Sequence, residues 1–223
     1  RWPAAFLAAL LRNDAGYFAP GVYAEEAKRL GASLQAPCVQ LGQAEHELLG
    51  LSTIRIGLAH VHGLSARTVA AIVVARAAGG PFRSFADFLQ RVRPARDEAE
   101  NLILVGACDA FGSSRPELLW RLQVASTRQG QRADAQVAAA ARGALFTEAV
   151  LPREVVYPAL PDFDEGRRSE AELRLLGFTL GSHPVDVLWR RGELPVLAHC
   201  VPCGRLEEHL GAVIRVCGFA VAF

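Results

Sequence analysis

The stretch "LAHVHGLSARTVAAIVVAR", Leu58 to Arg76, decides the fold because it places a glycine directly before a strongly helical run. Gly63 can adopt the positive φ that other residues avoid, so the chain can reverse tightly there. The following helix presents unpaired backbone N–H groups in its first turn, and the helix dipole adds partial positive charge. The stretch therefore predicts either an ordinary turn or a site where backbone amides near Gly63, Leu64 and Ser65 hold a phosphate.

A second glycine-containing connection favours the phosphate interpretation. Val105 to Gly112, in "VGACDAFGSSRPELLWRL", is flanked by predicted helices, as Val61 to Ser65 is. Two helix-hairpin-helix units related by approximate symmetry can grip two runs of phosphates across one groove, which a single turn cannot. We therefore expect a tandem module with one phosphate contact at each hairpin.

Most of the remaining sequence predicts helices. Apolar residues at helical spacing, proline starts and glycine or proline stops mark them. We expect helices over Pro3 to Asp14, Pro20 to Ala32, Ala66 to Arg76, Phe85 to Val92 with Ser84 as its cap, Asp97 to Val105, from near Pro116, and in "SEAELRLLGFTL". Periodicity fades from Ser33 to Leu51, a short strand is expected in "STIRIGLAHV", and a mainly β segment is expected from Leu194.

Composition sets limits on the class of protein. The 223 residues are 51% hydrophobic, enough for a core, and show no signal peptide or membrane-spanning run. Five scattered cysteines do not form the paired framework of a small secreted protein. We expect a cytoplasmic protein with no membrane partner and reduced thiols. Because the chain starts at Arg1 and contains no methionine, we also expect a piece of a longer protein.

Charge is distributed unevenly along the chain. The formal net charge is only +1, but His60 to Arg132 holds ten arginines and six acidic residues. This moderately basic region provides enough charge for a few phosphate contacts. Arginine supplies nearly all of it, since Lys28 is the only lysine, and arginine is suited to bidentate phosphate contacts.

Several segments occur in an order that resembles a known family. They are "PAAFLAALL", "EEAKRLGA", "IRIGLAHVHGLSARTVAAIVVAR", "GPFRSFADFLQRV", "NLILVGACDAFG" and "LLGFTLGSHPVDVL". This order resembles the C-terminal half of bacterial C-family DNA polymerases, namely the α subunit of DNA polymerase III and its error-prone relatives. The resemblance covers nearly the whole chain.

The resemblance implies a mainly α fold with four parts. Residues 1–50 would end the fingers region, 51–124 would form the tandem helix-hairpin-helix module, 125–193 a linker and helix, and 194–223 a truncated oligonucleotide-binding (OB) fold. The region would hold duplex DNA leaving a polymerase active site. Its DNA-binding residues would be His62, Gly63, Leu64, Ser65, Arg67, Thr68, Gly106, Ser113, Ser114 and Arg115.

The first hairpin departs from the family pattern. The family usually has Lys-Gly-Leu-Gly where this chain has His62-Gly63-Leu64-Ser65. The missing lysine removes one positive charge, and the missing second glycine restricts the approach of the backbone, while Ser65 can cap the following helix instead. The family's Pro-Asp-Val-Asn element appears here as "APCVQLG".

We expect no catalytic residue and no metal site in this chain. The parent polymerase would need Mg²⁺ held by paired carboxylates, and no such pair lies in a suitable strand. "DFDE", Asp162 to Glu165, has the spacing but lies in a proline-bounded loop. "HCVPC", His199 to Cys203, lacks the second Cys-x-x-Cys of a zinc site, so its cysteines are interpreted as small apolar residues.

A short apolar peptide suggests a protein partner. "GALFTE", Gly143 to Glu148, resembles a sliding-clamp peptide in which Leu145 and Phe146 would fill a pocket of the clamp. Two alternatives stay open beside the polymerase interpretation. One is the DNA-binding module of a repair nuclease or DNA-uptake protein, and the other is a scaffold that has lost DNA and binds a clamp or accessory protein.

Overall fold

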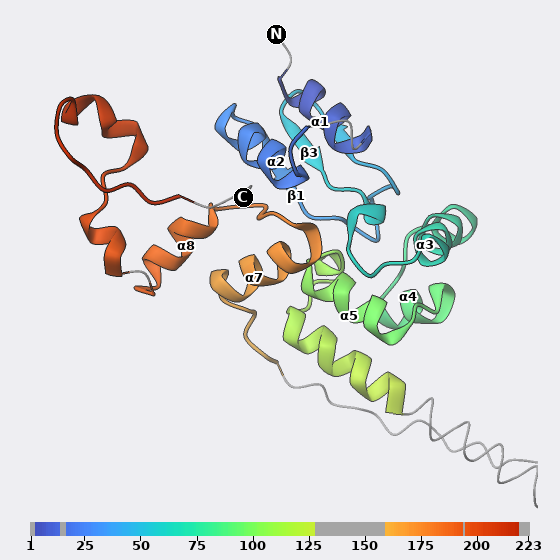
Figure 1. Ribbon diagram of the computed structural model, residues 1–223. Helices are drawn as coiled ribbons and strands as arrows, with labels where there is room; N and C mark the ends of the chain where they lie inside the picture. The colour runs from blue at the N-terminus through green and yellow to red at the C-terminus, as the bar shows by residue number, and fades with distance from the viewer. Residues whose placement is uncertain (1–2, 14–16, 128–158, 194, 219–223) are drawn as a thin grey trace, which may run out of the picture.

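The computed structural model describes residues 3–13, 17–127, 159–193 and 195–218, and its fold is mainly α (Figure 1). α1 (Pro3–Asn13) and α2 (Pro20–Arg29) pack against each other and against a small sheet. The sheet contains β1 (Ser33–Gln35), β2 (Glu47–Leu49) and β3 (Thr53–Arg55) in the order β1-β3-β2, with β1 parallel and β2 antiparallel to β3. The expected strand is β3, whereas β1 and β2 lie where periodicity fades.

The helices of the central module follow the sheet. They are η1 (Leu58–His60), α3 (Ala66–Gly79), α4 (Phe85–Val92), α5 (Arg96–Leu104), η2 (Asp109–Phe111) and a helix over residues 115–127. The Ser84 hydroxyl accepts a hydrogen bond from the Asp87 N–H at 3.1 Å, so the predicted cap of α4 is confirmed. The bounds match the predicted helices closely because capping residues and glycine stops mark them locally.

α7 (Glu165–Leu176) belongs to the same core as the central module. It lies beside α5 (Figure 1), and its buried Leu175 and Leu176 share a hydrophobic cluster with Leu58 and Val61. Its last turn also accepts a hydrogen bond from the first hairpin, since the Leu175 carbonyl receives the His62 N–H at 2.8 Å. The hydrophobic core thus includes residues of α7 as well as of the central module, and α7 contacts the first hairpin.

The turn after α7 is fastened to α2. The Lys28 ammonium donates to the carbonyls of Thr179 at 3.0 Å and Gly181 at 3.1 Å, and it pairs with Glu25 at 2.6 Å. Phe178 in this turn is buried. Lys28, the sole lysine, therefore joins α2 to the turn after α7, and its ammonium group is engaged within the protein.

The chain after α7 contains short helical pieces. These are α8 (Pro184–Arg190), η3 (Pro195–His199) and η4 (Cys203–His209). Over its described part, 211–218, the strand predicted for the end of the chain is not formed. A strand needs a partner for its backbone groups, and here the Val201 N–H donates to the Arg215 carbonyl at 2.8 Å without a ladder forming. The β character of the fold lies in the sheet near α1 and α2.

Candidate nucleic-acid interface

The first hairpin (residues 61–65) has the geometry that its sequence predicts. Gly63 is exposed and has φ +77°, and η1 and α3 flank the turn. A Cβ added at Gly63 would lie 2.8 Å from the Asn101 side-chain nitrogen, which donates to the His62 carbonyl at 3.4 Å. Both the conformation and the space at this position therefore favour glycine.

The start of α3 offers donors to an anion. Ser65 is the N-cap, and its hydroxyl accepts from the Thr68 N–H at 3.3 Å. Among the hydrogen bonds of the described residues, none is made by the N–H groups of Ala66 and Arg67, which are exposed. The first turn of α3 carries no acidic residue, and the Arg67 side chain adds a positive charge. This helix end can accept a phosphate oxygen.

Glu98 lies between the starts of two helices. One carboxylate oxygen accepts from the Ser65 N–H at 2.9 Å and the Ser65 hydroxyl at 2.6 Å. The other accepts from the Thr68 hydroxyl at 2.6 Å and the Ala95 N–H at 2.9 Å. These four bonds fill the acceptor capacity of the carboxylate. Glu98 therefore ties the start of α3 to the start of α5.

These bonds keep Glu98 ionised. Its partial burial alone would raise the pKa, but the hydroxyls of Ser65 and Thr68 and the backbone N–H groups of Ser65 and Ala95 lower the pKa to about 2. Two predicted phosphate ligands are thereby engaged within the protein, since the hydroxyls of Ser65 and of the buried Thr68 donate to Glu98. The N–H groups of His62, Leu64 and Ser65 are also engaged within the protein. At the first hairpin this leaves the N–H groups of Gly63, Ala66 and Arg67 and the exposed side chains of His62 and Arg67 to meet DNA.

The second predicted hairpin, residues 105–112, joins the end of α5 to the start of the helix over 115–127. Gly106 has φ +86° but is buried, and it follows the last turn of α5. The N–H groups of Gly106 and Ala107 donate to the carbonyls of Ile103 at 3.0 Å and Leu102 at 2.9 Å, as in a Schellman motif. A helix C-terminus has partial negative charge and disfavours phosphate. Gly106 itself therefore caps α5, and its N–H is not free for a phosphate.

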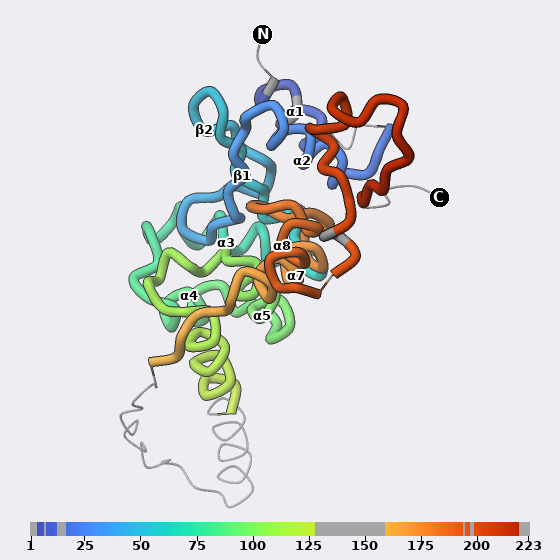
Figure 2. Tube along the Cα trace, turned by 90° about the vertical axis from the view of Figure 1, so that its left-hand side faces the viewer, coloured from blue at the N-terminus to red at the C-terminus, as the bar shows by residue number. Residues whose placement is uncertain are grey.

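The start of the next helix, over residues 115–127, is covered by the segment of the chain that contains Leu160 and Asp162. The Ser114 hydroxyl donates to the Leu160 carbonyl at 2.7 Å, and the Asp162 carboxylate accepts from the Arg115 N–H at 3.2 Å. In Figure 2 the orange segment before α7 runs past this helix start. A carboxylate of the protein thus occupies the place where a phosphate was predicted.

Arg115 is a structural residue in this arrangement. It is only 5% exposed, and its guanidinium pairs with Asp109 at 2.9 Å and donates to the Leu104 carbonyl at 2.9 Å. Ser113, its neighbour but one, is half-buried. Of the residues predicted to bind DNA around the second hairpin, Gly106 and Arg115 are thus buried, and Ser113 and Ser114 are half-buried.

The connection between α4 and α5 is the counterpart of the first hairpin. In both hairpins, a residue with positive φ precedes the N-cap of the next helix by two positions: Gly63 before Ser65, and Arg93 before Ala95. Arg93 has φ 51° and ψ 53° and is exposed. Since Glu98 joins the two N-caps, the hairpins lie next to each other. Sequence reasoning missed this one because it lacks a glycine, although Pro94 between two helices marks a turn.

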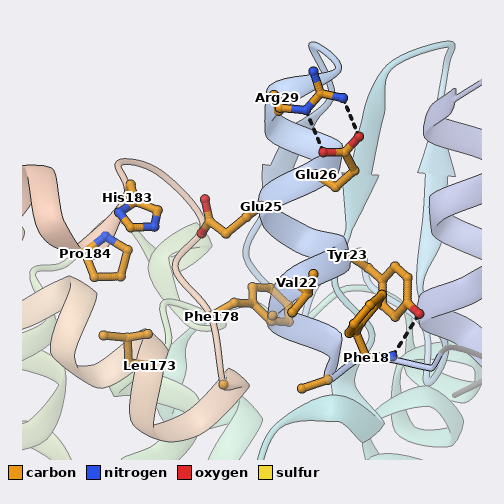
Figure 3. Close-up of a pocket in the computed structure, with 13 residues that line it drawn as sticks. Phe18, Val22, Tyr23, Glu25, Glu26, Arg29, Leu173, Phe178, His183 and Pro184 are labelled. Carbon is orange, nitrogen blue, oxygen red and sulfur yellow. Dashed lines mark hydrogen bonds and ion pairs between the residues drawn. The ribbon is translucent and has the colours of Figure 1, made fainter. Parts of the chain in front are cut away.

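A separate cavity of about 620 Å³ lies between α2 and the turn after α7 (Figure 3). Its lining is mostly apolar and includes Val22, Leu173 and Phe178, with His183 at the edge. The Arg29 guanidinium beside it is paired with Glu26 at 2.6 Å. The cavity is thus unlike a phosphate site, and nothing in the sequence pattern indicated it.

The other candidate sites have structural explanations or lie outside the described residues. Asp162 pairs with Arg168 at 2.6 Å, and Asp164 caps α7 by accepting the Arg167 N–H at 2.8 Å. Within the described ranges, no three His, Cys, Asp or Glu side chains are grouped as metal ligands. No helix in those ranges is long and apolar enough to cross a bilayer. Leu145 and Phe146 lie outside the described residues.

Comparisons with known proteins agree with this architecture. A family model described as a helix-hairpin-helix motif matches residues 31–118, which include both hairpins. An error-prone DNA polymerase of Mycobacterium tuberculosis is 32% identical over 206 residues, which are 92% of this chain and 17% of that protein.

Two further relatives show the range of similarity. An error-prone DNA polymerase of Burkholderia pseudomallei is 30% identical over 235 residues, covering 99% of this chain and 20% of the relative. A DNA polymerase III subunit alpha of Treponema pallidum is 29% identical over 192 residues, covering 83% of this chain and 16% of the relative. This chain spans at most a fifth of the length of these relatives, and it is similar to one region of these DNA polymerases.

Proposed function

We propose that this chain binds duplex DNA through its phosphate backbone, independently of base sequence, as the non-catalytic DNA-holding region of a DNA-directed DNA polymerase. The observation that carries the proposal is the pair of neighbouring hairpins joined by Glu98, one of which has an exposed glycine and unpaired N–H groups at a helix start. Backbone donors and helix starts contact phosphates and carry no base information.

The contacts at the first hairpin follow from which donors remain free. A phosphate oxygen can approach the exposed backbone at Gly63 and the N–H groups of Ala66 and Arg67. The Arg67 guanidinium can bind the same or the next phosphate. The negative charge of Glu98 lies nearby and weakens this contact, which fits a region that must hold DNA while letting it move.

The catalytic step belongs to the proposed parent protein as a whole. The relatives are named as DNA polymerases, and that reaction uses Mg²⁺ held by carboxylates. The carboxylates described here serve as helix caps and ion-pair partners, so no step of phosphoryl transfer is assigned to them. A cytoplasmic location is part of the same proposal.

Fluorescence anisotropy with labelled duplex DNA tests the proposal. We expect two duplexes of unrelated sequence to bind with equal affinity, and the affinity to fall steeply as salt rises. Arg67→Ala should weaken binding to both equally and reduce the salt slope by about one. Affinity that is unchanged between low and moderate salt, or that differs strongly between the two sequences, would contradict backbone recognition.

Clamp binding at Leu145 and Phe146 stays a separate hypothesis, supported by their peptide sequence alone. Substituting both by alanine should abolish retention on an immobilised sliding clamp and leave duplex affinity unchanged. Unchanged retention would reject this peptide as the clamp ligand.

A further inference from the structure

Arg93 is unusual within the described chain. It is the one residue other than glycine there with positive φ. This conformation costs a bulky side chain free energy, so glycine or asparagine would be the ordinary choice. The Arg93 side chain does little for the fold, because it is exposed and makes one long hydrogen bond of 3.4 Å from Nε to the Gln90 carbonyl.

The two neighbouring arginines are engaged within the protein. The Arg91 guanidinium pairs with Asp87 at 3.2 Å and lies over the Phe82 ring. Arg96 pairs with Glu100 at 2.9 Å and also donates to Gln123. Both Nη groups of Arg93 are without a partner among the described residues. Arg93 therefore presents the guanidinium of this hairpin that is available to a ligand.

Its place in the fold indicates the ligand. Arg93 stands where Gly63 stands in the first hairpin, two residues before an N-cap, and Glu98 joins the two N-caps through Ser65 and Ala95. A polyanion that contacts the backbone at Gly63 would therefore pass close to Arg93. A free guanidinium provides two parallel N–H groups that match the oxygens of one phosphate.

We infer that Arg93 is a phosphate-binding residue of the α4–α5 hairpin, which contacts duplex DNA with a side chain where the first hairpin uses its backbone. The inference rests on the proposed function and adds a residue to it. It also supplies a positive charge beside the first hairpin, where His62 is the exposed residue before Gly63.

Arg93→Gly tests the inference, because it removes the guanidinium and relieves the backbone. We expect the variant to unfold at the same or a higher urea concentration than the unchanged protein. Its duplex affinity should fall roughly three- to tenfold, and its salt slope should decrease by about one. Arg93→Asn, which tolerates this backbone conformation, should weaken binding to a similar extent. Arg93→Lys, which keeps the positive charge, should retain most of the affinity of the unchanged protein.

Arg83→Ala is the matched control. Arg83 is exposed and lies just before α4, whereas Arg93 lies just after it, so the two variants remove the same charge from opposite ends of one helix. We expect Arg83→Ala to bind duplex DNA within about twofold of the unchanged protein, as peripheral charges are screened.

The outcomes separate the two claims. If the unchanged protein shows no salt-sensitive duplex binding, the proposed function fails. If it binds and Arg93→Gly keeps the same affinity and slope, the inference about Arg93 fails alone. Lower stability of Arg93→Gly, or an equal loss in Arg83→Ala, would also overturn it, because the arginine would then act through the fold or through general charge.

Discussion

Gly63 and Gly106 show that similar turns can serve opposite ends of a helix. Both glycines have positive φ and lie between helical segments. Gly63 is exposed and precedes α3, where free N–H groups attract an anion, whereas Gly106 is buried and follows α5, where carbonyls are capped. A glycine between helices therefore indicates a phosphate site only when the helix start, rather than the preceding helix end, is exposed beside it.

The largest expected effect is that of Gly106→Ala on stability. A Cβ there would lie 2.9 Å from the Asp109 carboxylate, closer still to the Arg115 guanidinium, and in a strained backbone conformation. We expect the free energy of unfolding to fall by about 3 kcal/mol or more. Urea denaturation followed by circular dichroism measures it. A loss below about 1 kcal/mol would mean that the turn is not packed as described.

Glu98→Gln should come next, and its effect should depend on pH. Because the pKa of Glu98 in the folded protein, about 2, is below its unfolded value, the bonds stabilise the protein fully above about pH 4.5 and are lost as pH falls toward 2. This contribution is about 3 kcal/mol, an order-of-magnitude value. The variant should be less stable at pH 7 and lack this acid dependence. Identical denaturation of both proteins at pH 7 and pH 3 would contradict the role of Glu98.

Asp162→Asn tests the covered helix start at residues 113–115. Asp162 accepts from the Arg115 N–H and pairs with the half-exposed Arg168, so we expect a loss of about 1 kcal/mol in stability. Duplex affinity should stay within about twofold, as no phosphate contact is lost or gained. If removing this carboxylate tightened DNA binding strongly, the helix start would be a phosphate site after all.

The smallest effect is expected for Glu172→Gln in α7. Burial raises the pKa of Glu172 although the Leu180 N–H donates to its carboxylate at 2.8 Å. A raised carboxyl pKa means that stability is fully present below the unfolded pKa and declines as pH rises through the folded one. Glu172→Gln should remove this decline. Thermal melts between pH 4 and pH 7 would contradict the expectation if the decline persisted in the variant.

The sequence predicted features that are encoded locally. N-cap residues such as Ser65 and Ser84 and helix stops such as Gly79 predicted where the helices begin and end, and Gly63 predicted the first hairpin. Long-range contacts were not predictable in this way. Nothing near Asp162 or Glu98 in sequence reveals that each carboxylate reaches a helix start belonging to another part of the chain.

The α4–α5 hairpin was missed for a different reason. Its left-handed residue is Arg93, and an arginine gives no sign of positive φ in the sequence. The same rule of glycine punctuation that found Gly63 selected Gly106, which has positive φ but follows the last turn of α5. β1 and β2 were also missed, since each is only three residues long and shows no clear alternation.

The most direct measurement compares the duplex affinity of Gly63→Ala with that of Gly112→Ala. Both glycines are exposed with positive φ, so the backbone conformation alone should make each alanine cost about 1 to 2 kcal/mol of stability. Gly63→Ala must in addition displace the Asn101 side chain, whose nitrogen would lie 2.8 Å from the added Cβ. Gly112 is beside the covered helix start, where an added Cβ meets no described atom within 4 Å. We predict that Gly63→Ala lowers duplex affinity roughly tenfold and that Gly112→Ala leaves it unchanged, because the backbone at Gly63 contacts phosphate in this account and the loop at Gly112 does not. Equal affinities for the two variants, or a larger loss in Gly112→Ala, would contradict the assignment of DNA binding to the first hairpin.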